Sequence, residues 1–309
     1  MIELAKNRAG IYLVLWLLLV IYAVSRVLQV FPGRIPMLAV VVLHVVPPAV
    51  FALIHGSMFH RLRTMLIFFG ICLVTGNIFE NLGVHTGFPY GPYSFTNLMG
   101  PKLFVVPVFL GLAYVGMAYL SWTLARLILG EAKCSLAGLR VVTVPLVAGV
   151  IMVAWDFCMD PIWSTILHVW IWQRGGAYFG VPVSNFFGWY VAVYVIYQLF
   201  ALYIRNRSDR LRNRSLAPGL WPSSYWRLAI LFYAVSAAGN LLLVIPRTGF
   251  SAVFDASGTQ WKVSDITGAT ALSSIFTMGA FALAAWLRLD AQSTKEDRLS
   301  GIPLREITS

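Results

Sequence analysis

Three carboxylates, Glu80, Asp156 and Asp160, lie within apolar stretches of the sequence or at their ends. A charged side chain inside a membrane is costly, so such residues usually mark a functional site. Asp156 and Asp160 are four residues apart and would share one face of a helix. Carboxyl groups held close together in a dry site cannot all ionise easily. One can then stay protonated and act as a general acid, while an ionised neighbour acts as a general base.

Amide and aromatic side chains accompany these carboxylates. Asn77 and Asn81 would share a helical face with Glu80, and Asn185 begins a later apolar stretch. The candidates for substrate binding are Asn77, Asn81, His85, Tyr90, Tyr93, Trp155, Asn185 and Trp189. Structural alternatives exist for all of them. A carboxylate can simply hydrogen-bond a neighbouring helix, Asp160 can end a helix, and tryptophans can anchor a helix at the membrane surface.

The sequence indicates neither a metal site nor a cofactor. The five histidines are scattered. The three cysteines, Cys72, Cys134 and Cys158, have no paired spacing, so we expect neither a zinc site nor a disulfide framework. No glycine-rich phosphate loop or nucleotide fingerprint is present. We therefore expect chemistry that needs no metal and no redox cofactor.

The elements that must position these residues are membrane helices. Of the 309 residues, 59% are hydrophobic and 11% are charged, and the mean hydropathy is +0.77. Several apolar stretches reach the roughly 20 residues that a helix needs to cross a bilayer. We predict an all-α, polytopic transmembrane bundle of about eight spans, at residues 11–30, 36–56, 63–82, 103–129, 141–159, 186–204, 226–246 and 269–287. A single membrane domain would cover 1–289, with a motif-bearing core at about 76–190 and a polar cytoplasmic tail at 290–309.

The basic residues give these spans an orientation. If the N-terminus lies in the cytoplasm, the inside segments hold most of the 23 Lys and Arg residues, as the positive-inside rule requires. We therefore predict an integral protein of the cytoplasmic membrane with both termini in the cytoplasm. The net charge of +11 then reflects loops that contact anionic lipid, and no nucleic-acid partner is expected.

This topology would bring the candidate residues to one face of the membrane. Glu80, Asp160 and Asn185 fall at the outer ends of three different spans. The segment 162–172 carries three tryptophans, which are typical of the membrane interface. We predict that this segment forms a short helix that lies at the outer surface or re-enters the membrane.

Two blocks of residues resemble the membrane carotenoid hydratases. The first block is ENLGVHTGFPYGPY at 80–93, followed by Leu98, Gly100, Pro101, Lys102 and Pro107. The second block consists of Asp156, Asp160, Pro161, Trp170 and Trp172, then GAYFGVP at 176–182 and NFFGW at 185–189. The resembled family is the carotenoid-biosynthesis family that includes the gamma-carotene 1',2'-hydratases and the archaeal bisanhydrobacterioruberin hydratase. The two blocks cover roughly residues 76–190. The spans on either side of them match this family only in hydrophobicity.

The resemblance implies that water is added to the terminal double bond of an acyclic carotenoid end group, which gives a tertiary alcohol. The substrate would be a lycopene- or gamma-carotene-like molecule that arrives from the membrane lipid, and other carotenoid-pathway enzymes are candidate partners. From the residues themselves, we expect Glu80 or Asp156 to be the acid. Asp160, with Asn185 and Asn81, would orient the water. Tyr90, Tyr93, Trp155 and Trp189 would line the pocket and stabilise a carbocation.

Two other functions use the same features. Paired carboxylates inside a membrane also serve transporters or channels for a small or lipidic solute. A non-catalytic scaffold of a pigment-synthesis complex is a third possibility, and it predicts that the carboxylates can be neutralised without loss of pathway output. The gathering of the motifs on one face, with no visible internal repeat, favours an enzyme.

Overall fold

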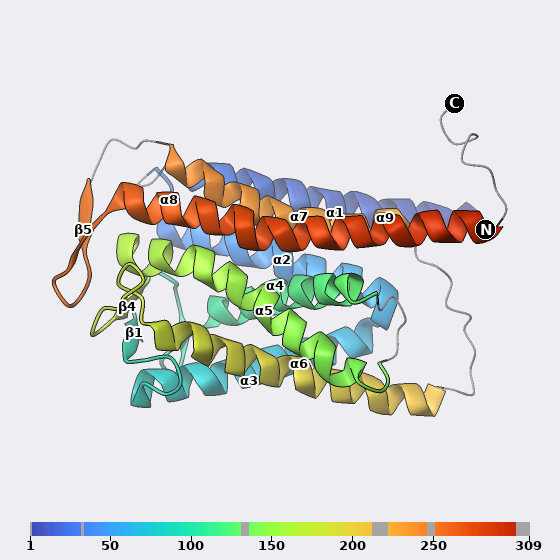
Figure 1. Cartoon of the computed structure of the whole chain (residues 1–309), viewed down its shortest axis with the longest axis horizontal. Coiled ribbons are helices and arrows are strands. Elements are labelled where there is room, and N and C mark those ends of the chain that lie inside the picture. The colour runs from blue at the N-terminus through green and yellow to red at the C-terminus, as the bar shows by residue number, and fades with distance from the viewer. Residues whose placement is uncertain (1, 32–33, 131–135, 212–221, 246–250, 301–309) are drawn as a thin grey trace.

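The computed structural model describes residues 2–31, 34–130, 136–211, 222–245 and 251–300, and these residues fold mainly into long helices (Figure 1). Eight of the described segments are long and apolar enough to cross a membrane. The helices are α1 (Ile2–Leu28), α2 (Met37–His60), α3 (Leu62–Thr86), α4 (Val108–Ile128), α5 (Arg140–Pro161), α6 (Val183–Leu211), α7 (Ser223–Leu241), α8 (Val263–Ser273) and α9 (Ala280–Ser300). The predicted all-α polytopic bundle of eight spans is therefore confirmed.

In the part of the chain that the structure describes, three spans contain a change of helix type. A π-helical turn, η1 (Ile162–Ile166), continues α5, and a 3-10 turn, η2 (Leu242–Val244), continues α7. The eighth span joins α8 to α9 through a second π-helical turn, η3 (Ser274–Gly279). α9 continues to Ser300, into the segment predicted as a polar tail. Turns of this kind are frequent at functional sites, and η1 directly follows Asp160 and Pro161.

Helix α4 forms the centre of the bundle. It packs against α2, α3, α5, α7 and α9, and its side chains from Tyr114 to Leu127 are all buried. Gly116 allows a close approach to α2, because a Cβ atom there would lie 2.8 Å from Cβ of Pro48. The outer helices expose large apolar side chains such as Val74 and Phe187. This is the pattern of a bundle whose surface faces lipid.

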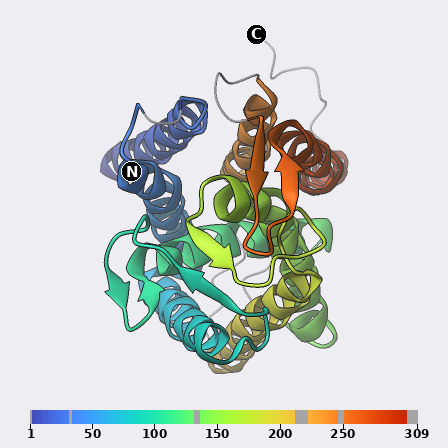
Figure 2. The same cartoon turned by 90° about the vertical axis from the view of Figure 1, so that its left-hand side faces the viewer.

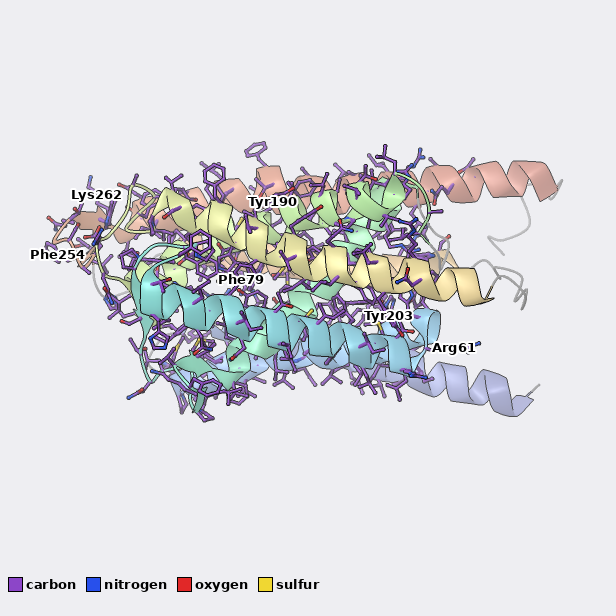
Figure 3. The ribbon with its side chains drawn as sticks, turned by 90° about the horizontal axis from the view of Figure 1, so that it is seen from below. Arg61, Phe79, Tyr190, Tyr203, Phe254 and Lys262 are labelled. Atoms are coloured by element: carbon purple, nitrogen blue, oxygen red, sulfur yellow. The ribbon has the colours of Figure 1, made fainter. Side chains whose placement is uncertain are left out.

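Short strands gather at one end of the bundle (Figures 1 and 2). Within the described residues they form three antiparallel pairs: β1 (Tyr93–Phe95) with β4 (Trp170–Trp172), β2 (Lys102–Leu103) with β3 (Val106–Pro107), and β5 (Ala252–Phe254) with β6 (Gln260–Lys262). Figure 3 places Phe254 and Lys262 at this strand-bearing end and Arg61 toward the opposite end.

The Trp-rich segment differs from its prediction as a short helix over 162–172. Only Ile162–Ile166 is helical, and Trp170–Trp172 is strand β4. The strand form has a physical reason: Trp170 and Trp172 are both buried, while Ile171 between them is only partly buried. Alternation with a period of two directs both indoles to the same side of a strand. The prediction of a helix was therefore wrong for the tryptophans at 170 and 172.

Candidate active site

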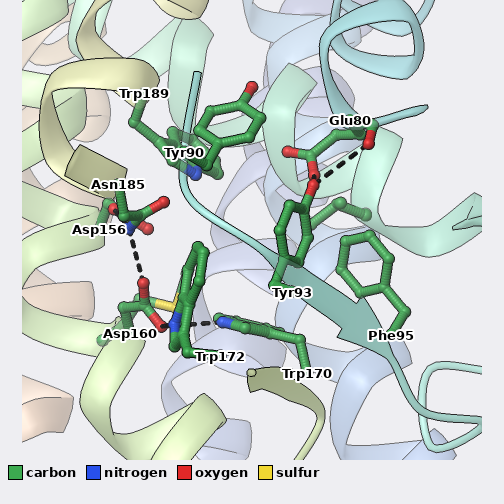
Figure 4. A pocket seen from close by; sticks show the side chains of 12 residues that line it. Glu80, Tyr90, Tyr93, Phe95, Asp156, Asp160, Trp170, Trp172, Asn185 and Trp189 are labelled. Atoms are coloured by element: carbon green, nitrogen blue, oxygen red, sulfur yellow. Dashed lines mark hydrogen bonds between the residues drawn. The ribbon is translucent and has the colours of Figure 1, made fainter. Parts of the chain in front are cut away.

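A small cavity lies at the strand-bearing end, between helices α3, α4, α5 and α6 and the β1–β4 pair (Figure 4). Its volume of about 20 Å³ is enough for about one water molecule. Its lining consists of Glu80, Tyr90, Tyr93, Phe95, Leu110, Asp156, Met159, Asp160, Trp170, Trp172, Asn185 and Trp189. Figure 4 shows Glu80 on one side, and Asp156, Asp160 and Asn185 on the other. Three carboxyl groups from two helices therefore line one small void.

Two tyrosine hydroxyls hold Glu80, which is buried in the last turns of α3. Tyr114 of α4 donates a hydrogen bond to Oε1 over 2.5 Å, and Tyr93 of β1 donates one to Oε2. Burial, together with the neighbouring Glu80 charge, raises the pKa of the Tyr93 phenol well above its usual value. Tyr93 therefore keeps its proton and remains a donor to the carboxylate.

Asp160 accepts hydrogen bonds from three side-chain groups. The indole nitrogens of Trp170 and Trp172 lie 2.8 and 3.2 Å from its Oδ1. The amide nitrogen of Asn185 lies 2.7 Å from its Oδ2. Because hydrogen bonds donated to a carboxylate favour its ionised form, this arrangement stabilises a negative charge on Asp160. It also fixes the orientation of the carboxylate toward the cavity.

Asp156 is held by far fewer donors. Among the described residues it accepts one hydrogen bond, from the Asn185 amide nitrogen over 3.1 Å. The same amide group therefore bridges both aspartates, which lie one helical turn apart on α5. Its oxygen, Oδ1 of Asn185, is buried and has no hydrogen-bond partner among the described residues. A buried acceptor without a donor is costly, and a water in the cavity would satisfy it.

Aromatic rings enclose the remaining sides of the cavity. Trp189 stacks on Tyr114 with ring centroids 4.7 Å apart, and Tyr93 packs against Trp172 at 4.9 Å. Two glycines make room for the Tyr90 ring. A Cβ atom on Gly83 would lie 2.6 Å from Cδ2 of Tyr90, and one on Gly188 would lie 2.8 Å from its Cδ1. The run that follows α3 can therefore fold back over the helix ends and seal the cavity.

The structure brings most of the predicted residues together. Glu80, Asp156, Asp160, Tyr90, Tyr93, Asn185 and Trp189 all line the cavity. Asn77 and Asn81 do not: the Asn81 amide donates to the backbone and side-chain oxygens of Asn77, over 2.8 and 2.9 Å. His85 is exposed in the last turn of α3. Trp155 is half-buried and contacts Trp189 edge to face at 6.2 Å, outside the lining.

Several important residues were not predicted as part of the site. Tyr114, Trp170 and Trp172 supply three of the donors to the carboxylates, and the lining also includes Phe95, Leu110 and Met159. Tyr114 carried a usable signal, because a tyrosine hydroxyl in the middle of an apolar helix needs a polar partner. Among the described residues, no three His, Cys, Asp or Glu side chains form a group suited to a metal ion.

The chain was compared with known proteins and protein families, and one family matches the region that forms the cavity. No curated protein and no solved structure gives a significant match. A sequence model described as carotenoid biosynthesis protein matches residues 37–253, a range that contains every residue of the cavity lining. Since the match covers more than half of the chain, this protein belongs to the carotenoid biosynthesis protein family.

Proposed function

We propose that this protein is a carotenoid hydratase that adds water to the terminal double bond of an acyclic carotenoid end group. The product is a tertiary alcohol. Membership of the carotenoid biosynthesis family supports the pathway and a lipid-borne carotenoid substrate. One observation supports this chemistry above all. Asn185, whose Oδ1 has no hydrogen-bond partner among the described residues, lines a void of about one water together with three carboxyl groups.

The hydrogen bonds favour Asp156 as the general acid. Asp156 accepts one hydrogen bond among the described residues and Asp160 accepts three, so the negative charge is better stabilised on Asp160. The sequence alone left Glu80 and Asp156 as equal candidates. Glu80 already accepts hydrogen bonds from two tyrosines, which favours its ionised form as well.

The proposed reaction has two steps. The Asp156 proton passes to the less substituted carbon of the double bond, whose π electrons form the new C–H bond and leave a tertiary carbocation. A water held by Oδ1 of Asn185 then forms a C–O bond to the cation and loses a proton to Asp160. Transfer of this proton from Asp160 back to Asp156, one helical turn away, restores the starting state.

The rest of the lining stabilises the cation. The ionised Glu80 lies across the cavity from the aspartates and would lower the energy of a positive charge between them. The faces of Trp189 and Tyr90 can each contribute up to about 2 kcal/mol of cation–π attraction when desolvated. No metal or redox cofactor takes part in this mechanism.

The cavity as it stands holds water but is too small for an isoprene end group, so substrate binding requires lining side chains to move. We propose that the polyene enters from the lipid between helices. We also propose that the protein lies in the cytoplasmic membrane with both termini in the cytoplasm, which puts the site near the outer face. The site is at one end of the bundle, and this position favours an enzyme over a transporter.

Expression in a host that accumulates lycopene tests the function. Pigment extracts are analysed by mass spectrometry for a gain of one water per reacted end. We expect hydrated product from the native chain and from Asp265→Asn, a matched change at an exposed carboxylate of α8. Asp156→Asn should form the product at least about 100-fold more slowly while the protein still accumulates in the membrane. The proposal is wrong if the native chain hydrates none of the acyclic carotenoids supplied.

A further inference from the structure

A second, larger cavity lies at the strand-bearing end, with a volume of about 480 Å³. We call it the vestibule, and its lining consists of Ser164, Thr165, His168, Ile171, Trp172, Gly180, Phe254, Asp255 and Ala256. Several of these side chains are polar, unlike the lipid-facing surface of the bundle. Trp172 lines the vestibule and the active-site cavity alike. Trp172 is therefore the residue that the two linings share.

The β5–β6 hairpin forms one wall of the vestibule, and hydrogen bonds to Asp255 hold this hairpin in shape. Oδ1 of Asp255 accepts hydrogen bonds from the backbone and hydroxyl of Ser257, over 2.9 and 2.6 Å, and from the Thr259 backbone over 3.1 Å. Its Oδ2 accepts one from the Trp261 indole over 2.9 Å. This carboxylate is fully used in shaping the hairpin. Gly180 lets the hairpin approach, since a Cβ atom there would lie 3.0 Å from Cβ of Asp255.

The hydrogen bond from Trp172 to Asp160 is longer than that from its neighbour on the strand. Its indole nitrogen is 3.2 Å from Oδ1 of Asp160, against 2.8 Å for Trp170, and hydrogen bonds weaken with distance. If the Trp172 ring turns away, Asp160 keeps its bonds to Trp170 and Asn185. Ser164, which lines the vestibule, donates from its hydroxyl to the main-chain carbonyl oxygen of Asp160, four residues earlier, over 2.8 Å.

We propose that the vestibule is the water entrance of the active site and that Trp172 is the movable partition between them. This inference deepens the proposed function and rests on it, because each hydration consumes one water and the active-site cavity holds about one. A carotenoid that arrives from lipid brings no water with it. The vestibule supplies the water, and a closed Trp172 keeps the carbocation away from bulk solvent.

Radiolytic hydroxyl-radical labelling of the purified full-length protein tests the route without using activity. Met159 lines the active-site cavity, so its oxidation rate reports the water that reaches this cavity. A cysteine is placed at Ala256, on the vestibule wall, and reacted with a bulky sulfonated maleimide. The matched control is a cysteine at Gln260, which is exposed on the same hairpin and does not line the vestibule. Both variants carry Cys134→Ser, while Cys72 and Cys158 are buried.

We expect the blocked Ala256→Cys protein to oxidise Met159 several-fold more slowly than its unblocked form. The blocked Gln260→Cys protein should show no change. In an independent variant, Trp172→Ala, Met159 should be oxidised faster. Equal oxidation of Met159 in blocked and unblocked Ala256→Cys protein would overturn the inference. Absence of hydrated carotenoid from the unblocked protein would instead contradict the proposed function, and the labelling result separates the two failures.

Discussion

Two buried polar clusters lie against the central helix α4, and one of them surrounds a void. The active-site cluster contains Tyr114. The second, which we call the histidine cluster, consists of His55, Tyr119 and Tyr225 and joins α2, α4 and α7. Nε2 of His55 lies 2.9 Å from the Tyr225 carbonyl oxygen and must carry the proton, so Nδ1 accepts from the Tyr119 hydroxyl over 2.6 Å. Tyr225 donates in turn to the His55 carbonyl oxygen over 2.9 Å.

The difference between the clusters lies in what is left unsatisfied. In the histidine cluster both imidazole nitrogens have partners, and the imidazole stacks on the Tyr225 ring at 3.8 Å. In the active-site cluster, Oδ1 of Asn185 has no partner among the described residues, and Asn185 lines a space of about one water. Buried polar groups by themselves therefore indicate only that helices are joined. An open acceptor beside a void indicates a place for a reactant.

The largest expected effect separates the two clusters by activity. Asp156→Asn removes the proposed acid, so the hydration rate should fall by about 10²- to 10⁴-fold. His55→Leu should leave the rate per folded protein nearly unchanged. Product formation in membranes, normalised to folded protein, measures both. If His55→Leu were as inactive as Asp156→Asn, the two clusters would not differ in their role in the reaction.

A second variant decides which carboxylate is the acid. Glu80→Gln removes a negative charge that stabilises the cation but leaves the Asp156 proton in place. The rate should fall by about 10- to 100-fold, the size expected when a charged hydrogen-bonded group is lost. Rates of Glu80→Gln and Asp156→Asn are compared in the same membranes. If Glu80→Gln is the more damaging change, Glu80 is the acid and our assignment is reversed.

The same substitution at two positions on α4 sharpens the comparison. Tyr114→Phe removes a donor to Glu80, and we expect about a tenfold loss of rate with a small loss of stability. Tyr119→Phe leaves Nδ1 of His55 without a donor, which should lower the free energy of unfolding by about 1–3 kcal/mol and leave the rate per folded protein unchanged. Thermal unfolding in detergent and product formation are measured for both variants. If both variants lost the same amounts of stability and rate, the distinction between a catalytic and a structural cluster would be contradicted.

The smallest expected effect concerns the vestibule wall. Burial alone would raise the pKa of Asp255, but hydrogen bonds from Ser257, Trp261 and Thr259 outweigh it and lower the pKa below its usual 3.8. The ionised carboxylate therefore stabilises the hairpin above about pH 3.8, and this contribution is lost as the pH falls through the lowered pKa. Asp255→Asn should cost less than about 1 kcal/mol at pH 7, since the residue is partly exposed and water screens its charge.

Melting temperatures of the native chain and of Asp255→Asn check this sign. The difference between them should be present at pH 7 and should shrink as the pH drops below about 3.8. A difference that grows in acid would show that the carboxylate does not organise the hairpin in its ionised form.

Local patterns in the sequence predicted the membrane bundle and part of the site. Hydrophobic stretches of spanning length are a local signal, and so is the spacing of Asp156 and Asp160 on one helical face. Helical spacing identifies a face but not its partner. It grouped Asn77 and Asn81 with Glu80, whereas the two amides bond to each other.

The remaining site residues depend on contacts between distant segments. Tyr114 reaches Glu80 from a different helix, 34 positions away in the chain. Trp170 and Trp172 reach Asp160 because β4 pairs with β1, a strand about 80 residues earlier. Neither contact leaves a periodic trace in the sequence, because both are set by how the helices and strands pack.

The volume of the active-site cavity has one more consequence for the proposed reaction. Because the cavity has room for about one water molecule, water acts here as a stoichiometric reactant and not as a solvent. A carbocation that forms before this molecule has arrived has no water to attack it. It can return its proton to Asp156, which regenerates the alkene. An empty cavity would then cost the enzyme time but would release no damaged pigment.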